Sequence, residues 1–356
     1  MNKLKRIALG LTAVLLLGIL SVLPAAAENK YSSLLVLGDS ISTGYGLENY
    51  TPGGTPYLCR SYANLLAESL SLKGGETYIN RAVNGDASDD LLKLMPTLKN
   101  YVAKSELIVI SIGGNDLLHI LPNVVSKVSG QSVSGIQEAA QVVLKLDKTV
   151  LAEGLKNPEV LSIVLGAVTG YSQNLGGIIS LLHEYNPSAR VIFLAQYNPM
   201  NGFAEAGDFG VFAGTVIDAL NLALNSAVAS SGFGYEVADI PSVINVNAEG
   251  YTNITSLDIH PNAEGHGLIG QYMIGLVGNN ADPVTKAEET TAEPETTVQD
   301  TTSEPETSAV PESTVEVTSA DESSAPAEKK GCGSSVGFVA VLAVAAGALC
   351  LAKRRK

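Results

Sequence analysis

The chain has 356 residues and a formal net charge of −14, and 46% of its residues are hydrophobic. Residues 28–282 carry 24 acidic side chains against 12 lysines and arginines. This balance disfavours binding to nucleic acid or to an anionic lipid surface, because both need clustered positive charge. Neutral sugars and uncharged esters remain open as ligands.

The first 27 residues have the pattern of a secretory signal peptide. The basic "MNKLKR" precedes the apolar run "IALGLTAVLLLGILSVL", and Ala25 and Ala27 supply the small residues of a cleavage site. We expect cleavage after Ala27. The alternative is an uncleaved membrane anchor, because the apolar run is somewhat long. The folded domain is then expected at residues 28–282, a length sufficient for one large domain.

The C-terminal part has a different composition. Residues 283–330 consist mainly of Thr, Glu, Ser, Pro and Ala, with no aromatic residue, and predict a disordered stalk. Residues 331–356 contain an apolar segment followed by "KRRK", which predicts a transmembrane anchor with a cytoplasmic end. The alternative is a bacterial C-terminal sorting signal that is later cleaved. Either way the domain is expected to be exported and held at the cell surface.

Five short runs rich in Val, Ile and Leu are typical of strands buried on both faces of a parallel sheet. They lie at 34–37, 78–83, 107–112, 191–195 and 235–240. Segments with helical spacing of apolar residues alternate with them. These segments begin near Ser61, Asp89, Tyr171, Phe212 and Pro261. The alternation predicts an α/β fold, a three-layer α/β/α sandwich with a parallel sheet.

The region from about Ile120 to Gly170 is helical in pattern and longer than a simple crossover requires. It predicts a helical insertion beside the carboxyl edge of the sheet. Two alternatives remain open here: the insertion walls or covers a cleft, or it is a packed bulge without substrate contact.

Polar or glycine-rich sequence follows three predicted strands, as "GDS", "NRAVNGDAS" and "ISIGGND", and "LDIHPNAEGH" precedes the last helix. Ligands of open α/β sheets bind outside the carboxyl ends of the strands. Acyl transfer requires a nucleophile, a base and donors aimed at the developing oxyanion. Ser40 is the candidate nucleophile and His260 the candidate base. The Gly85 N–H and the Asn115 amide are the candidate oxyanion donors.

These blocks resemble those of the SGNH/GDSL hydrolase superfamily of serine esterases and lipases. Ser40 in "GDSIS", Gly85 in "VNGDAS", Asn115 in "GGND" and His260 in "DIHPN" match its four blocks in order, and the resemblance covers residues 33–278. It implies a flavodoxin-like sheet and ester hydrolysis without a metal or organic cofactor. It also implies an oxyanion hole formed by the N–H groups of Ser40 and Gly85 and the Asn115 side chain.

One position departs from the family pattern. The family places the aspartate of its triad three residues before the histidine, where this chain has Leu257. Asp258 stands two residues before His260. We expect Asp258 to orient the imidazole, and the alternative is support by a backbone carbonyl.

Other polar residues near these blocks have simpler interpretations. Asp39, Asp86 and Asp116 are expected to fix loops rather than to take part in the reaction. His260 and His266 are six residues apart without a third histidine or a cysteine nearby, so no metal site is expected. His119 and His183 are expected to be ordinary core-edge or surface residues. Segment 42–66, which has three tyrosines before Ser61, and the "QYNPM" stretch are candidates for substrate contact, and a plain surface loop is the alternative for the first.

The predicted function is that of a bacterial surface-tethered serine esterase acting on short-chain or glycan O-acetyl esters through an acyl-enzyme on Ser40. The alternative is a lipase or lysophospholipase, favoured if the helical insertion forms an apolar lid. A non-catalytic carbohydrate-binding module is a further hypothesis. The expected partner is a small-molecule or polysaccharide ester, with no nucleic acid, and with membrane contact through the C-terminal anchor only.

Overall fold

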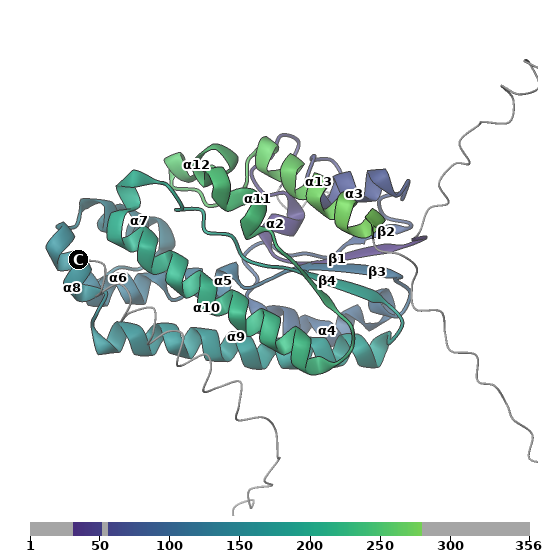
Figure 1. Ribbon diagram of the computed structural model, residues 1–356, viewed down its shortest axis with the longest axis horizontal. Coiled ribbons are helices and arrows are strands. Elements are labelled where there is room, and N and C mark those ends of the chain that lie inside the picture. The colour runs from purple at the N-terminus through teal and green to yellow at the C-terminus, as the bar shows by residue number, and fades with distance from the viewer. Residues whose placement is uncertain (1–30, 52–55, 280–356) are drawn as a thin grey trace, which may run out of the picture. The chain divides into compact units, whose positions relative to one another are not determined.

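The computed structural model describes residues 31–51 and 56–279, and Figure 1 shows them as coloured ribbon. The predicted signal peptide, the stalk and the anchor or sorting signal lie outside these residues. The described residues form a five-stranded sheet in the order β2-β1-β3-β4-β5, and every pairing is parallel. Its strands are β1 (Leu34–Gly38), β2 (Tyr78–Asn80), β3 (Leu107–Ser111), β4 (Arg190–Leu194) and β5 (Glu236–Ala238). The predicted α/β fold with a flavodoxin-like sheet is confirmed.

The second strand is shorter than its apolar run predicts. It ends at Asn80, whose side chain accepts a hydrogen bond from the N–H of Ala82 and donates one to the carbonyl of Ser42. The chain still follows β1 beyond that point, because the N–H of Val83 donates to the carbonyl of Gly38. The predicted end at Val83 therefore marks the end of contact with β1 rather than the end of the regular strand.

Alternate residues of the central strands pack into two separate cores. Leu35 and Leu37 of β1 point to one face of the sheet, and Leu34 and Val36 point to the other. Figure 1 shows helices covering both faces, as the three-layer prediction requires. One layer holds α4 (Ser88–Val102), α9 (Pro158–Tyr185) and α10 (Gly207–Ser231), and the other holds α3 (Tyr62–Ser69), α11 (Pro241–Ile244) and α13 (Ala263–Asn279).

A helical insertion with its own core stands at the carboxyl edge of the sheet. Its helices are α6 (Leu121–Ser129), α7 (Ile136–Lys145) and α8 (Lys148–Gly154), together with the first part of α9. Its core joins Val124, Val143 and Val160 to Phe209 of α10. The predicted helix start near Tyr171 is wrong, because α9 runs without a break from the insertion to the sheet. Its packing partners change between Val164 and Val168, close to the predicted end of the insertion near Gly170. The first turns of α9 pack in the insertion, and later side chains such as Leu175 pack under the sheet.

The short elements of the described chain lie in its loops. They are α2 (Ser40–Thr43), α5 (Gly114–Leu118), α12 (Ala248–Tyr251), η1 (Ala204–Ala206), η2 (Asn245–Asn247) and η3 (Ile254–Ser256).

One stretch of the described chain, Ala204–Ser231, is long and apolar enough to cross a membrane by length and composition. The core helix of a soluble protein passes the same test. Here Leu220, Ala223 and Leu224 of α10 lie in the core beneath the sheet. Packing against the sheet therefore accounts for the buried third of this apolar stretch.

Candidate active site

The first strand delivers Ser40 to the carboxyl edge of the sheet through a tight turn. Gly38 has φ +114°, and a Cβ there would lie 1.8 Å from the carbonyl oxygen of Ser111. Only glycine therefore lets the end of β1 lie against β3 closely enough for the Asp39 N–H to donate to that carbonyl at 2.9 Å. Ser40 follows as the first residue of α2, with Asp39 as its N-cap.

The Asp39 side chain fixes this turn, as expected. It is buried, and its Oδ1 accepts hydrogen bonds from the Ile41 N–H and the Ser111 hydroxyl, each at 3.1 Å. Burial raises the pKa of Asp39 to about 7, although these hydrogen bonds lower it in part. The carboxyl group therefore holds together two strand ends.

The predicted base lies beside the predicted nucleophile. His260 Nε2 is 2.8 Å from Ser40 Oγ. On the other side of the ring, His260 Nδ1 is hydrogen-bonded to Asp258 Oδ1, which also accepts from the His260 backbone N–H at 3.1 Å. Asp258 thus reaches the imidazole although it stands one residue closer than the family pattern.

The loop before His260 has a backbone that makes this contact possible. It turns sharply after η3, where Leu257 adopts a left-handed conformation with φ +58°. The Asn253 N–H donates to the His260 carbonyl, and the Asp258 N–H donates to the Asn253 carbonyl. The Tyr197 hydroxyl, from the "QYNPM" stretch after β4, donates to the Ile259 carbonyl at 2.7 Å. Hydrogen bonds from two sides therefore hold this loop, residues 253–260, which we call the histidine loop.

The predicted oxyanion donors come from the loops after β2 and β3. Asn115 is buried at the start of α5, and its amide donates to the Asp86 carbonyl at 2.9 Å. An amide nitrogen has two hydrogens, so this bond orients the group and leaves a second donor for a ligand. Gly85 has φ +84° with open space where a Cβ would be. Asp116 joins the two loops, because its carboxylate accepts from the Ser88 N–H at 2.9 Å and from the Ser88 hydroxyl.

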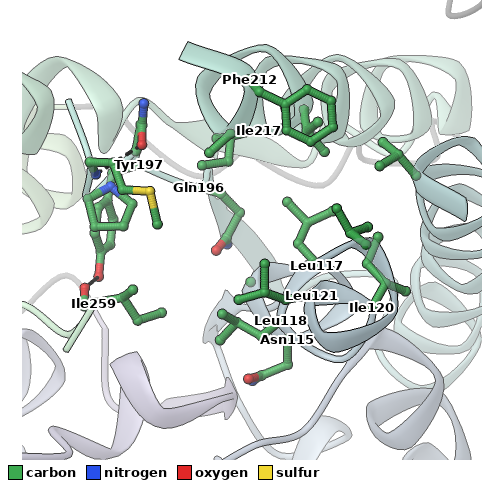
Figure 2. A pocket seen from close by; sticks show the side chains of 18 of the residues that line it. Asn115, Leu117, Leu118, Ile120, Leu121, Gln196, Tyr197, Phe212, Ile217 and Ile259 are labelled. Atoms are coloured by element: carbon green, nitrogen blue, oxygen red, sulfur yellow. Dashed lines mark hydrogen bonds between the residues drawn. The ribbon is translucent and has the colours of Figure 1, made fainter. Parts of the chain in front are cut away.

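A cavity of about 130 Å³ extends from Ser40 and Asn115. Figure 2 shows Leu117, Leu118 and Leu121 across the cavity from Tyr197 and Ile259. The insertion supplies part of this wall through Leu121, Val124 and Val164, and α10 supplies Phe212, Ala213, Val216 and Ile217. Of the two alternatives for the insertion, the structure thus supports the one in which it walls a cleft.

A sequence model of the GDSL-like lipase/acylhydrolase family matches residues 36–268. The chain belongs to this family. The sequence is 24% identical to the uncharacterised protein YpmR of Bacillus subtilis over 249 residues, which are 68% of this chain and 82% of that protein. It is 31% identical to an arylesterase of Vibrio mimicus over 123 residues, 34% of this chain and 56% of that protein. The resemblance noted from the motifs is confirmed, and the chain is a carboxylic ester hydrolase of the GDSL family.

Among solved structures, the lipase Lip_vut3 from a goat rumen metagenome is similar to this GDSL hydrolase with a TM-score of 0.47 and 20% identity. The match covers 68% of this chain and 95% of that one.

An aromatic cluster beside the histidine was not predicted in this form. In the GDSL hydrolase, the Tyr45 ring packs on the His260 ring with centroids 4.6 Å apart, and Tyr50 packs edge-on against Tyr45. The Asn84 amide donates to the Tyr50 hydroxyl, and the Thr43 hydroxyl donates to the Asn84 side chain at 2.6 Å. The three tyrosines before Ser61 in segment 42–66 were the available signal. The sequence made this segment a candidate for substrate contact, with a plain surface loop as the alternative, whereas the structure places one of these tyrosines on the imidazole.

The other three histidines of the GDSL hydrolase lie apart from the Ser40–His260 pair. His266 is fully buried and accepts a hydrogen bond from the Tyr62 N–H, and burial lowers its pKa to about 3. His119 is exposed, and His183 stacks on Phe233. Within residues 31–51 and 56–279, no group of three or more His, Cys, Asp or Glu side chains is placed to hold a metal ion.

The burial of Asp39 makes the stability of this hydrolase depend on pH. The folded-state pKa of about 7 lies above the ordinary aspartate value of 3.8, so between these values only the folded state keeps the proton. Stability is therefore lost as the pH rises through this window, by at most about 1.4 kcal/mol per pH unit. Asp39→Asn keeps the Oδ1 acceptor without the charge. We expect this variant to gain stability over the parent between about pH 5 and about pH 8 in chemical denaturation at several pH values.

The exposed Asp239 provides the control for this prediction. Asp239→Asn should change stability by the same small amount across the pH range. An Asp39→Asn variant whose advantage over the parent does not grow with pH would contradict the prediction.

Proposed function

We propose that this GDSL hydrolase cleaves carboxylic esters through an acyl-enzyme on Ser40. His260 Nε2, 2.8 Å from Ser40 Oγ, takes the hydroxyl proton as the oxygen attacks the ester carbonyl. The same nitrogen then donates that proton to the departing alcohol. Water, deprotonated by His260, attacks the acyl-enzyme, and His260 then returns that proton to Ser40 Oγ as the acid is released. Asp258, bonded to Nδ1, keeps the ring in this orientation and stabilises its positive charge.

The oxyanion formed in each step is assigned to three donors. They are the backbone N–H groups of Ser40 and Gly85 and the free hydrogen of the Asn115 amide. The hydrogen bond from the Asn115 amide to the Asp86 carbonyl supports this assignment, because it fixes the orientation of the amide before substrate binds. A single preorganised donor of this kind contributes about 3 kcal/mol to transition-state stabilisation.

The observation that carries the substrate proposal is the apolar lining of the cavity at Ser40. Its walls are chiefly Leu, Ile, Val and Phe side chains, and each methylene of an acyl chain that they bury contributes about 0.8 kcal/mol. An acetyl group is too small to use these walls. The cavity therefore favours the lipase or lysophospholipase alternative over the short-chain or glycan O-acetyl esters expected first from the sequence.

The alcohol side of the site is of a different kind. Gly85 has open space around it, and the nearby Asn84 and Tyr50 are polar and joined by a hydrogen bond. We propose that the alcohol lies on this open side, so the enzyme accepts varied alcohols and selects mainly by acyl group.

The cellular location is a proposal from the sequence alone. A signal peptide at 1–27 and an anchor or sorting signal at 331–356, joined to the hydrolase domain at 28–282 by a stalk at 283–330, would hold the enzyme at the cell surface.

A series of nitrophenyl esters tests the proposed function. The purified protein is assayed on acetate, butyrate, octanoate and dodecanoate esters. We expect kcat/KM to rise about fourfold per methylene until the apolar site is filled. A preference for acetate over every longer chain would instead identify a deacetylase, and no hydrolysis of any ester would refute the proposal.

A further inference from the structure

A second cavity, of about 60 Å³, lies between α7, the segment around η1 and the histidine loop. We call it the outer cavity and the one at Ser40 the inner cavity. Every residue that lines the outer cavity is apolar. They are Leu118, Leu121, Ile136, Ala140, Val143, Leu144, Met200, Phe203, Ala206, Phe209, Ile254, Leu257 and Ile259. A cavity with such a lining suits hydrocarbon rather than water, because water needs polar partners.

The two cavities share part of their walls. Leu118, Leu121, Met200, Phe209 and Ile259 line both of them. The wall between the inner and the outer cavity therefore consists of apolar side chains, and a long acyl chain attached at Ser40 would pass along them.

The far side of the outer cavity reaches the surface. Ile136 and Leu144 of α7 are 40% and 41% exposed, whereas Val143 on the same helix is buried. Covering large, exposed apolar side chains at the rim of an apolar cavity with hydrocarbon removes apolar surface from water, which is favourable in free energy.

We propose that the outer cavity binds the distal part of a long acyl chain, so that α7 sets the acyl-length preference of the enzyme. This inference rests on the proposed esterase function. It assigns the acyl chain rather than the alcohol, because the lining contains no residue of 43–51, the segment that packs on His260 beside the open alcohol side.

Ala140 allows a direct test. It is half-buried on α7 and lines the outer cavity but not the inner one, so Ala140→Phe fills the outer cavity alone. Gln141→Phe adds the same ring to an exposed position of the same helix and is the matched control. We expect Ala140→Phe to keep kcat/KM for the butyrate ester within about twofold and to lower it at least about tenfold for the dodecanoate ester. The control should keep the profile of the parent.

A binding measurement separates this inference from the esterase proposal. Calorimetry on Ser40→Ala protein compares dodecanoate and butyrate binding with and without Ala140→Phe, and needs no turnover. A loss of at least about tenfold in dodecanoate affinity, with butyrate affinity unchanged, supports the outer cavity as an acyl site. Equal dodecanoate affinity with and without Ala140→Phe would overturn it, even if the parent hydrolyses esters. The proposal would also be overturned if, among esters, the loss of kcat/KM in Ala140→Phe depended on the length of the alcohol and not on the length of the acyl chain.

Discussion

Ser40→Ala is expected to lower kcat for ester hydrolysis by about 10⁶-fold, because no other group of the site can form the acyl-enzyme. The fold should survive. Among residues 31–51 and 56–279 the Ser40 hydroxyl is hydrogen-bonded to His260 alone, so its removal leaves no other described polar group without a partner. Steady-state kinetics on the best nitrophenyl ester, together with thermal unfolding, measure both effects.

Ser42→Ala is the matched control, two residues along the same short helix. The Ser42 hydroxyl is buried and bonds to the Leu37 carbonyl and to the Tyr62 hydroxyl at 2.7 Å. Its loss should lower stability by about 1–3 kcal/mol and leave kcat near the parent value. If the Ser40→Ala enzyme retains about one hundredth of the parent kcat or more, the nucleophile lies elsewhere.

Asp258→Asn is expected to lower kcat by about 10³–10⁴-fold with a smaller change in KM. Asparagine keeps the size of the side chain, but it neither stabilises the imidazolium nor holds the ring in one tautomer. Asp258 acts through His260 on the chemical step rather than on substrate binding, so kcat should carry most of the loss. Kinetics on the same ester at several pH values measure this effect.

Glu264→Gln provides a control for the loss of one acidic charge near the histidine loop. Glu264 is an exposed residue four positions after His260. The Glu264→Gln enzyme should hydrolyse esters as the parent does. If Asp258→Asn also keeps kcat within about tenfold, the support of the imidazole comes from a backbone carbonyl, the alternative left open by the sequence.

The sheet and the four motif blocks could be predicted because they depend on local pattern. Strands buried on both faces produce continuous apolar runs, and β1 and β3 agree with their predicted runs to within one residue at each end. The positions of Ser40 and Asn115 follow from the rule that parallel strands end at one edge of the sheet.

The histidine loop could not be predicted in the same way. Whether Asp258 reaches His260 depends on the left-handed backbone of Leu257, a conformation that leucine rarely adopts. Hydrogen bonds from Asn253 and from Tyr197, which is remote in sequence, accompany that conformation. Likewise, the packing of Tyr45 on the imidazole joins segments more than 200 residues apart. Sequence spacing does not encode such contacts.

The unbroken course of α9 links substrate preference to folding. Val164, in its first half, lines the inner cavity, while Leu175 and Ile178, in its second half, pack beneath the strands that present Ser40 and Asn115. The insertion is consequently not a module that can be excised or exchanged to give a new specificity, because its removal would take away part of the layer that supports Ser40 and Asn115. Redesign of the acyl preference has to proceed by single side chains along the cavity walls, with the helices kept in place.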